Sequence, residues 1–164
     1  MFPTRVSIHL LADHPQLIPA VGEMRWKEWG NAPERQDLQW WVDVTAKEAG
    51  SDALPITWVA IDDRGRAVGA VGLAEFDLEE RHDRSPWLIG MIVSLPLRGS
   101  GIGGALVQNL KEWASDRGYA EVWVATGGRA IDFYRKYGWH LFEVLEQSSG
   151  ESTVLRFTVE PNEA

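Results

Sequence analysis

Residues 92–107 read IVSLPLRGSGIGGALV and combine three signals in a fixed order. The apolar run from Trp87 to Val93 leads into them and predicts a buried strand. Four glycines then fall within the six residues 99–104. With Gly118 as the expected C-terminal cap, the run that follows predicts a helix. Its apolar side chains recur at helical spacing: Ile102, Leu106, Leu110, Trp113 and Ala114.

The cluster of glycines needs a physical reason, because glycine loses the most backbone freedom on folding. One reason is the close approach of a ligand to the backbone. Unpaired N–H groups and the positive end of the helix dipole attract phosphate at such a place. Arg98 adds a cation at the mouth of the loop. A flexible turn is the alternative, but the order of strand, Arg, glycines and helix favours a phosphate-binding loop.

Two other phosphate motifs fit less well. Gly99, Gly101 and Gly104 match the G-x-G-x-x-G dinucleotide fingerprint. That fingerprint opens a long series of strand–helix units, with an acidic residue at the end of the next strand. Here Glu121 stands where the next strand begins. A kinase-type P-loop requires Lys and then Ser or Thr after its last glycine, and residues 105–106 are Ala and Leu.

Residues 98–103 (RGSGIG) resemble the pyrophosphate loop of the GNAT acetyltransferases, which reads Arg or Gln, x, x, Gly, x, Gly or Ala. Residues 130–139 (AIDFYRKYGW) are similar to that family's second block, F-Y-x-x-x-G-F. The resemblance implies an α/β (α+β) fold in a single domain over residues 1–164. It further implies a mixed, mostly antiparallel sheet of about seven strands, splayed at a central parallel pair and flanked by about four helices.

Length and composition fit this interpretation. A chain of 164 residues with 45% hydrophobic and 24% charged residues suits one soluble domain. Without cysteines there is no disulfide and no thiolate nucleophile, and we expect no metal site. The net charge of −8 argues against nucleic-acid binding and mildly favours a cationic partner, with an acidic balance that only keeps the protein soluble as the alternative. With no apolar signal or membrane-spanning run, we expect a cytoplasmic protein that does not bind membranes.

The rest of the chain predicts alternating strands and helices. We expect strands over residues 6–10, 56–61, 67–76, 121–126, 139–145 and 153–159. A first helix starts at Asp13–Pro15 and ends at residues 30–33. A second helix starts at residues 30–33, has residues 38–45 on its apolar face and stops at residues 49–50, and a short helix ends at Gly138. The charged residues 77–85 predict a solvated loop, which could instead reach over a ligand site.

The resemblance implies acetyl-CoA as co-substrate. The edge of the strand at residues 91–93 would pair with the pantetheine arm, and a backbone N–H near Val93 would act like an oxyanion-hole donor. The residues expected to bind the cofactor are Met91, Ile92, Val93, Arg98, Gly99, Ser100, Gly101, Ile102, Gly103, Gly104 and Tyr134.

Acid and base roles follow less directly. Tyr134 matches the tyrosine that many relatives use as general acid for the leaving thiolate, with core packing as the alternative. The strand before the loop carries no carboxylate, so Glu75 or Asp77 is the candidate base, with His82 and Asp83 as weaker alternatives. A neutral amine would need no base. Where relatives often have an asparagine, residues 127–129 are Gly-Gly-Arg.

The resemblance also implies that the first two helices and the link between them form one wall of the acceptor groove. An aromatic wall with acidic neighbours suits an ammonium group, although packing is the alternative for each tryptophan. The candidates are Trp26, Glu28, Trp29, Glu34, Trp40, Trp41 and Glu75. We therefore expect an N-acetyltransferase of a small-molecule primary amine. A protein N-terminus or lysine as acceptor, a non-catalytic acyl-CoA sensor, a nucleotide-binding domain and a homodimer remain open alternatives.

Overall fold

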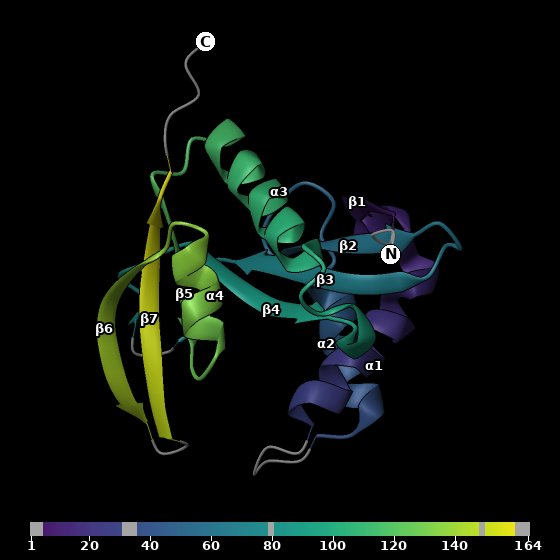
Figure 1. The fold of residues 1–164 in the computed structure, drawn as a ribbon, viewed down its shortest axis with the longest axis horizontal. Coiled ribbons are helices and arrows are strands. Elements are labelled where there is room, and N and C mark those ends of the chain that lie inside the picture. The colour runs from purple at the N-terminus through teal and green to yellow at the C-terminus, as the bar shows by residue number, and fades with distance from the viewer. Residues whose placement is uncertain (1–4, 31–35, 79–80, 148–149, 160–164) are drawn as a thin grey trace. The chain divides into compact units, whose positions relative to one another are not determined.

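The predicted alternation of strands and helices is present in the computed structural model (Figure 1), which describes residues 5–30, 36–78, 81–147 and 150–159. The strands are β1 (Val6–Leu10), β2 (Ile56–Asp62), β3 (Ala67–Ala74), β4 (Trp87–Val93), β5 (Glu121–Thr126), β6 (His140–Gln147) and β7 (Gly150–Thr158). The α-helices are α1 (Ile18–Trp29), α2 (Leu38–Lys47), α3 (Ile102–Asp116) and α4 (Ala130–Lys136). Short 3-10 turns cover Leu11–Asp13, Pro15–Leu17 and Leu95–Leu97.

The strands form one mixed sheet in the order β1-β2-β3-β4-β5-β7-β6. β1 pairs antiparallel with β2, and β2 with β3. On the other side, β5 and β6 each pair antiparallel with β7. The central pair β4 and β5 is parallel, with Trp87 opposite Trp123. This confirms the predicted fold class, a mixed and mostly antiparallel sheet with a parallel pair.

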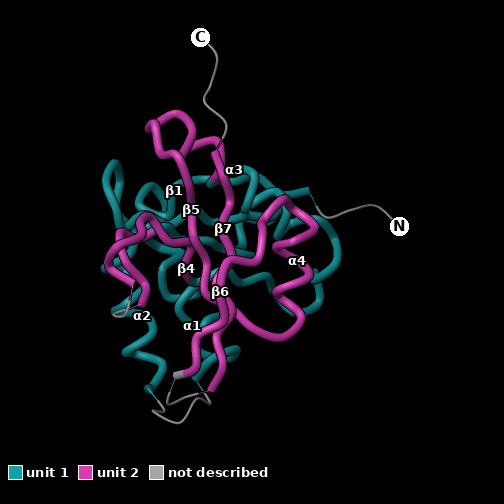
Figure 2. Tube along the Cα trace, turned by 90° about the vertical axis from the view of Figure 1, so that its left-hand side faces the viewer, with its two compact units in different colours: residues 1–73, 90–110 teal, residues 74–89, 111–164 magenta. Residues whose placement is uncertain are grey.

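Two compact units make up the chain (Figure 2). Unit 1 comprises residues 1–73 and 90–110, and unit 2 comprises residues 74–89 and 111–164. β4 therefore begins in unit 2 and reaches unit 1 at Gly90, while α3 begins in unit 1 and ends in unit 2. The glycine loop belongs to unit 1, and Tyr134 belongs to unit 2.

Unit 1 has packed side chains on both faces of its strands. On one face, Val21 of α1 is buried with Val59 of β2 and Ala70 of β3. α3 packs against the opposite face of β3. A Cβ at Gly69 would lie only 3.1 Å from Leu106 Cδ1 of that helix. Neighbouring residues of a strand point to opposite faces, so these contacts place α1 and the first half of α3 on different sides of β3 (Figure 1).

Unit 2 buries aromatic side chains around β5, β7 and α4. Trp87 and Trp123 are buried with Val154, and their rings lie 6.1 Å apart. In a second group of rings within the unit, Trp139 lies between Tyr134 and Phe157, with ring centroids 5.4 Å and 5.8 Å away. Large aromatic side chains supply much of the buried area in a core of this kind.

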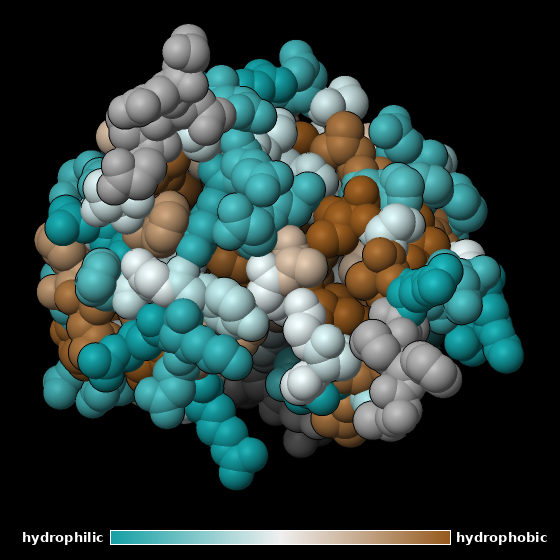
Figure 3. All heavy atoms as spheres, turned by 45° about the horizontal axis from the view of Figure 1, so that its top comes forward, coloured by the Kyte–Doolittle hydropathy of each residue, from teal (hydrophilic) through white to brown (hydrophobic). Residues whose placement is uncertain are grey.

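The second helix was expected to start at residues 30–33, of which 31–33 lie outside the described residues, and α2 begins at Leu38, with Asp37 as its N-cap. β7 begins at Gly150 rather than at residue 153. The first helix also differs from its predicted bounds. It begins at Ile18 rather than at residues 13–15, because His14 has a non-helical backbone and Pro15 opens a separate 3-10 turn. Gly118 has the predicted left-handed backbone (φ +78°) just after α3. No helix within the described ranges is both long and apolar enough to cross a membrane. On the face drawn in Figure 3, apolar patches alternate with hydrophilic ones.

Candidate active site

The loop before α3 exposes its backbone. Gly99 and Gly101 have φ values of +82° and +95°, in the left-handed region that favours glycine. A Cβ built on either residue would meet no heavy atom within 4 Å. These glycines are therefore required by backbone conformation, and the space beside them is not filled by neighbouring side chains. The geometry suits a group that approaches the backbone itself.

Some N–H groups of the loop are already bonded within it. The N–H of Ser100 donates to the carbonyl of Leu97 at 3.3 Å, and its hydroxyl donates to the same oxygen. α3 begins at Ile102, and the first N–H groups of an α-helix have no acceptor within the helix. Donors at the start of α3 therefore suit an anion better than the Ser100 amide does.

Arg98 and Glu28, which we expected to serve different ligands, form an ion pair with each other. Arg98 Nη2 lies 2.8 Å from Glu28 Oε2, and both side chains are about two-fifths exposed. Arg98 Nε also donates to the carbonyl of Val93 at 3.1 Å. The side chain of Arg98 thus links the end of β4 to the end of α1. An anion that binds Arg98 has to compete with Glu28.

The segment expected to hold the pantetheine arm is anchored at both ends. Ile92 is buried in the unit 1 core, and the N–H of Ser94 donates to the carbonyl of Val68 at 2.8 Å. At its start, Gly90 has φ +57°, an unusual backbone for a strand residue. The carbonyl of Gly90 accepts a hydrogen bond from Arg25 Nε at 3.2 Å.

Arg25 was not predicted as a site residue. Only 2% of it is exposed, and its Nη1 donates to Thr45 Oγ1 at 3.2 Å and to Glu48 Oε1 at 3.1 Å. Burial lowers the pKa of Arg25, and Glu48 offsets part of that effect. Burial likewise raises the pKa of Glu48 against the opposing charge of Arg25. The signal in the sequence was a charged residue four positions after Val21, on the apolar stripe of α1.

Three of the tryptophans expected at the acceptor wall lie together. Trp41 stacks on Trp29 at 6.1 Å, and Trp40 meets Trp41 edge-on at 5.1 Å. Trp29 and Trp40 are 36% and 41% exposed, so this cluster presents aromatic surface to solvent. Trp26 packs instead on Gly30, where a Cβ would lie 2.6 Å from its Cδ1. Glu34 lies outside the described residues.

Tyr134 is buried in unit 2, with 4% of it exposed. Its ring lies 5.1 Å from that of Phe133 and 5.4 Å from that of Trp139. Burial raises the pKa of its phenol above the ordinary value of 10.0, because the charged phenolate is poorly solvated there. The side chain can therefore donate a proton or a hydrogen bond at neutral pH, but it cannot serve as a base.

The candidate bases Glu75 and Asp77 are exposed residues just after β3, at the start of unit 2. Phe76 stacks on His82 at 4.3 Å, so the charged connection folds back on itself. The structure thus places these carboxylates on a surface segment, within the same unit as Tyr134.

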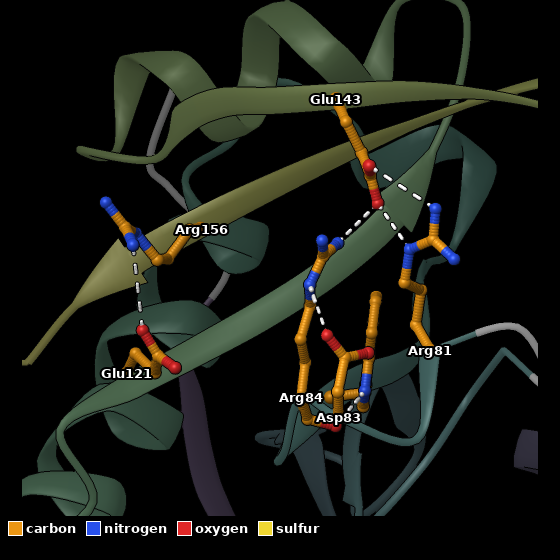
Figure 4. A network of polar contacts seen from close by, with 7 residues as sticks. Arg81, Asp83, Arg84, Glu121, Glu143 and Arg156 are labelled. Atoms are coloured by element: carbon orange, nitrogen blue, oxygen red, sulfur yellow. Dashed lines mark hydrogen bonds and ion pairs between the residues drawn. The ribbon is translucent and has the colours of Figure 1, made fainter.

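The charged connection is also tied to β6 (Figure 4). Arg81 and Arg84 both donate to the carboxylate of Glu143, and Arg81 Nε lies 2.7 Å from Oε1. These hydrogen bonds hold the pKa of Glu143 below its ordinary value. Arg84 also lies over the rings of Trp123 and Phe142, at 4.9 Å and 4.5 Å. Such pairing ties residues 81–84 of the connection to β6 within unit 2.

Comparison with known proteins fits this geometry. An open glycine loop between a strand and a helix is what a coenzyme-binding transferase needs for a pyrophosphate. The chain belongs to the acetyltransferase (GNAT) family, whose model matches residues 18–139. This confirms the resemblance inferred from residues 98–103 and 130–139. Within the part of the chain that the structure describes, no three His, Asp or Glu side chains are grouped to hold a metal ion.

One curated relative and two solved structures illustrate the similarity. The chain is 30% identical over 128 residues to human (Homo sapiens) N-acetyltransferase 8B, a match covering 74% of this chain and 54% of that protein. The chain thus spans about half the length of this relative.

An aminoglycoside 6'-N-acetyltransferase in complex with coenzyme A superposes with a TM-score of 0.75 at 17% identity, over 98% of this chain and 99% of that chain. A phosphinothricin acetyltransferase from Sinorhizobium meliloti with acetyl-CoA gives 0.73 at 17%, over 99% and 95%.

Proposed function

We propose that this chain is an acetyl-CoA-dependent N-acetyltransferase that acts on a small-molecule primary amine. The observation that carries the proposal is the open backbone at Gly99 and Gly101, directly before α3, in a member of the acetyltransferase (GNAT) family. The structural relatives named above include acetyltransferases in complex with coenzyme A and with acetyl-CoA, which supports the same co-substrate here.

The residues at the start of α3 fit the anionic end of acetyl-CoA. Amides of Gly101, Ile102, Gly103 and Gly104 would bind the pyrophosphate, with the helix dipole adding favourable potential. Arg98 would leave its ion pair with Glu28 and bind phosphate oxygens through its guanidinium instead. The backbone of residues 91–93 would bind the pantetheine arm as an added strand does.

In the proposed reaction the amine nitrogen attacks the thioester carbonyl carbon within a ternary complex. A C–N bond forms, the C–S bond breaks, and the nitrogen loses one proton while the sulfur gains one. Tyr134 is the proposed donor to sulfur, since burial keeps its phenol protonated. A phenol with a raised pKa is a weaker acid than an ordinary thiol, so its contribution is a hydrogen bond to the developing thiolate before the proton moves.

A small cationic acceptor fits the acidic and aromatic character of α1 and α2. Trp29 and Trp40 present exposed rings, and Glu28 supplies a carboxylate once Arg98 has released it. Glu75 or Asp77 is the proposed base, directly or through water. The same proposal includes one functional domain over residues 1–164 and a cytoplasmic location, without a nucleic-acid or membrane partner, and it leaves a homodimer open.

The test is release of free thiol from acetyl-CoA across a panel of polyamines, aminoglycosides, amino acids and peptides. We expect amine-dependent thiol release, with a mass increase of one acetyl group on the acceptor. Binding of coenzyme A without turnover on any amine would favour the acyl-CoA-sensing alternative. Thermal protection by ATP or NAD but not by coenzyme A would contradict the proposal.

A further inference from the structure

A buried guanidinium contacts β4 at Gly90, a residue with positive φ. Arg25 of α1 donates from Nε to the carbonyl of Gly90 and from Nη1 to Thr45 and Glu48 at the end of α2. One side chain therefore connects two helices to β4 inside unit 1. Only 2% of Arg25 is exposed, and these contacts take the place of water at Nε and Nη1. Its Nη2 is buried and has no hydrogen-bond partner among the described residues.

Gly90 and Arg25 fit each other closely. A Cβ at Gly90 would lie 2.5 Å from Arg25 Nη2 and 2.7 Å from Cζ, both far inside van der Waals contact. The φ of +57° turns the peptide away from ordinary strand geometry, and Arg25 Nε bonds the carbonyl of this turned residue. Glycine and arginine together thus fix one particular backbone conformation at this position.

The turned residue comes immediately before the segment expected to hold the thioester arm. We propose that Arg25 is a positioning residue, which fixes the backbone of β4 at Gly90 and thereby sets residues 91–93 for the thioester of acetyl-CoA. This inference rests on the proposed function. Arg25 touches no reacting group in this scheme. It acts through the carbonyl of Gly90, and the ion pair with Glu48 holds its guanidinium in place.

The variant that tests the role is Arg25→Lys, with Thr45→Val as matched control. A lysine keeps the charge beside Glu48 but has a single ammonium, which cannot reproduce the fork that reaches both Gly90 and α2. Thr45→Val removes a hydrogen bond from the same guanidinium at a site that is 0% exposed, yet leaves the bond to Gly90. Both variants lose a buried hydrogen bond of Arg25, but only Arg25→Lys loses the bond that is proposed to position Gly90.

Hydrogen exchange followed by mass spectrometry gives the first readout. In the full chain without ligand, the amides of residues 90–93 should exchange about tenfold faster in Arg25→Lys and at an unchanged rate in Thr45→Val. Equal exchange in both variants would overturn the inference, whether or not the protein proves to be an acetyltransferase.

Coenzyme binding gives the second readout. Arg25→Lys should weaken coenzyme A about tenfold while leaving the affinity for adenosine 3',5'-bisphosphate, which lacks the pantetheine arm, unchanged. Equal weakening of both ligands would show general destabilisation and would contradict the inference. Failure of the wild type to bind coenzyme A would instead contradict the proposed function. If Arg25→Lys does not fold, the double variant R25M/E48M, which removes the ion pair as a unit, takes its place.

Discussion

Gly90 and the glycines of the loop before α3 have similar backbones and opposite surroundings. Gly90 has φ +57°, and Gly99 and Gly101 have +82° and +95°. The space where a Cβ would stand is occupied at Gly90 by the guanidinium of Arg25, whereas nothing lies within 4 Å of it at Gly99 and Gly101. The first glycine serves packing within the protein. The other two leave room for something that the protein itself does not supply.

Openness alone does not define a ligand site. Gly65 in the β2–β3 turn and Gly118 after α3 also have positive φ and open space, and both have an ordinary role in ending an element. The loop at 99–101 differs because it follows a strand and precedes the free amides of a helix. Gly65 and Gly118 therefore serve as controls for Gly90 and Gly101 in the predictions below.

The largest effect is expected for Gly90→Ala. The new Cβ would overlap Arg25, and alanine disfavours positive φ, so unfolding should become easier by about 3 kcal/mol or more. Gly65→Ala shares the positive φ in open space, and should lose only about 1 kcal/mol. Chemical denaturation of both variants measures the difference. Equal losses would show that Arg25 does not constrain Gly90.

Tyr134 is buried like a packing residue, but we expect it to act in the reaction like a ligand-binding one. Tyr134→Phe should lower kcat about 100-fold and leave the KM for acetyl-CoA nearly unchanged. Tyr137→Phe, on the same helix end, is the control. Since the pKa of Tyr134 is raised above 10.0, its protonated form persists below pH 10, and this group should add no alkaline fall in rate there. Unchanged kcat in Tyr134→Phe would eliminate the acid role.

Gly101→Ala tests whether the open space beside the glycine loop binds coenzyme A. A Cβ in the space beside the loop, together with a strained φ, should weaken coenzyme A about tenfold. Gly118→Ala imposes comparable strain at the other end of α3, and should lose similar stability without losing affinity. Calorimetric titration and thermal unfolding measure the two quantities. Equal affinity in both variants would place the coenzyme away from the loop.

The smallest effect is expected for Glu28→Gln. Removing the carboxylate frees Arg98 for phosphate, so the affinity for coenzyme A should rise about threefold. Glu23→Gln on the same helix removes a carboxylate that pairs with Lys27, and should leave the affinity unchanged. The gain should shrink at high salt. A weaker affinity in Glu28→Gln would mean that this pair holds Arg98 in its binding position.

Local patterns in the sequence predicted most strands, the helices and the glycine loop, whereas the fold class followed from the family resemblance that two of these patterns carry. Hydrophobic spacing predicted α3, with Ile102 and Leu106 buried as expected. The two motifs at 98–103 and 130–139 identified the family, because each combines residue types that only a specific backbone or ligand requires. The end of α3 was also predicted from a local feature, because Gly118 has the left-handed backbone expected of a C-terminal cap.

Contacts between distant parts of the chain could not be predicted in this way. Arg25 and Gly90 are 65 positions apart, and Arg98 and Glu28 are 70 apart. Periodicity shows that Arg25 lies on the apolar stripe of α1, but not which carbonyl it meets. The pairing of Arg81 and Arg84 with Glu143 likewise depends on strand register in unit 2. Tests of site residues must therefore include these pairs.

A crystal structure of the acetyl-CoA complex is the most direct test of the proposed site. We predict pyrophosphate oxygens within hydrogen-bond distance of the amides of residues 101–104, Arg98 turned from Glu28 to the phosphates, and the thioester arm along residues 91–93. Coenzyme bound elsewhere on the protein, with the loop unoccupied and the ion pair between Arg98 and Glu28 intact, would contradict the account.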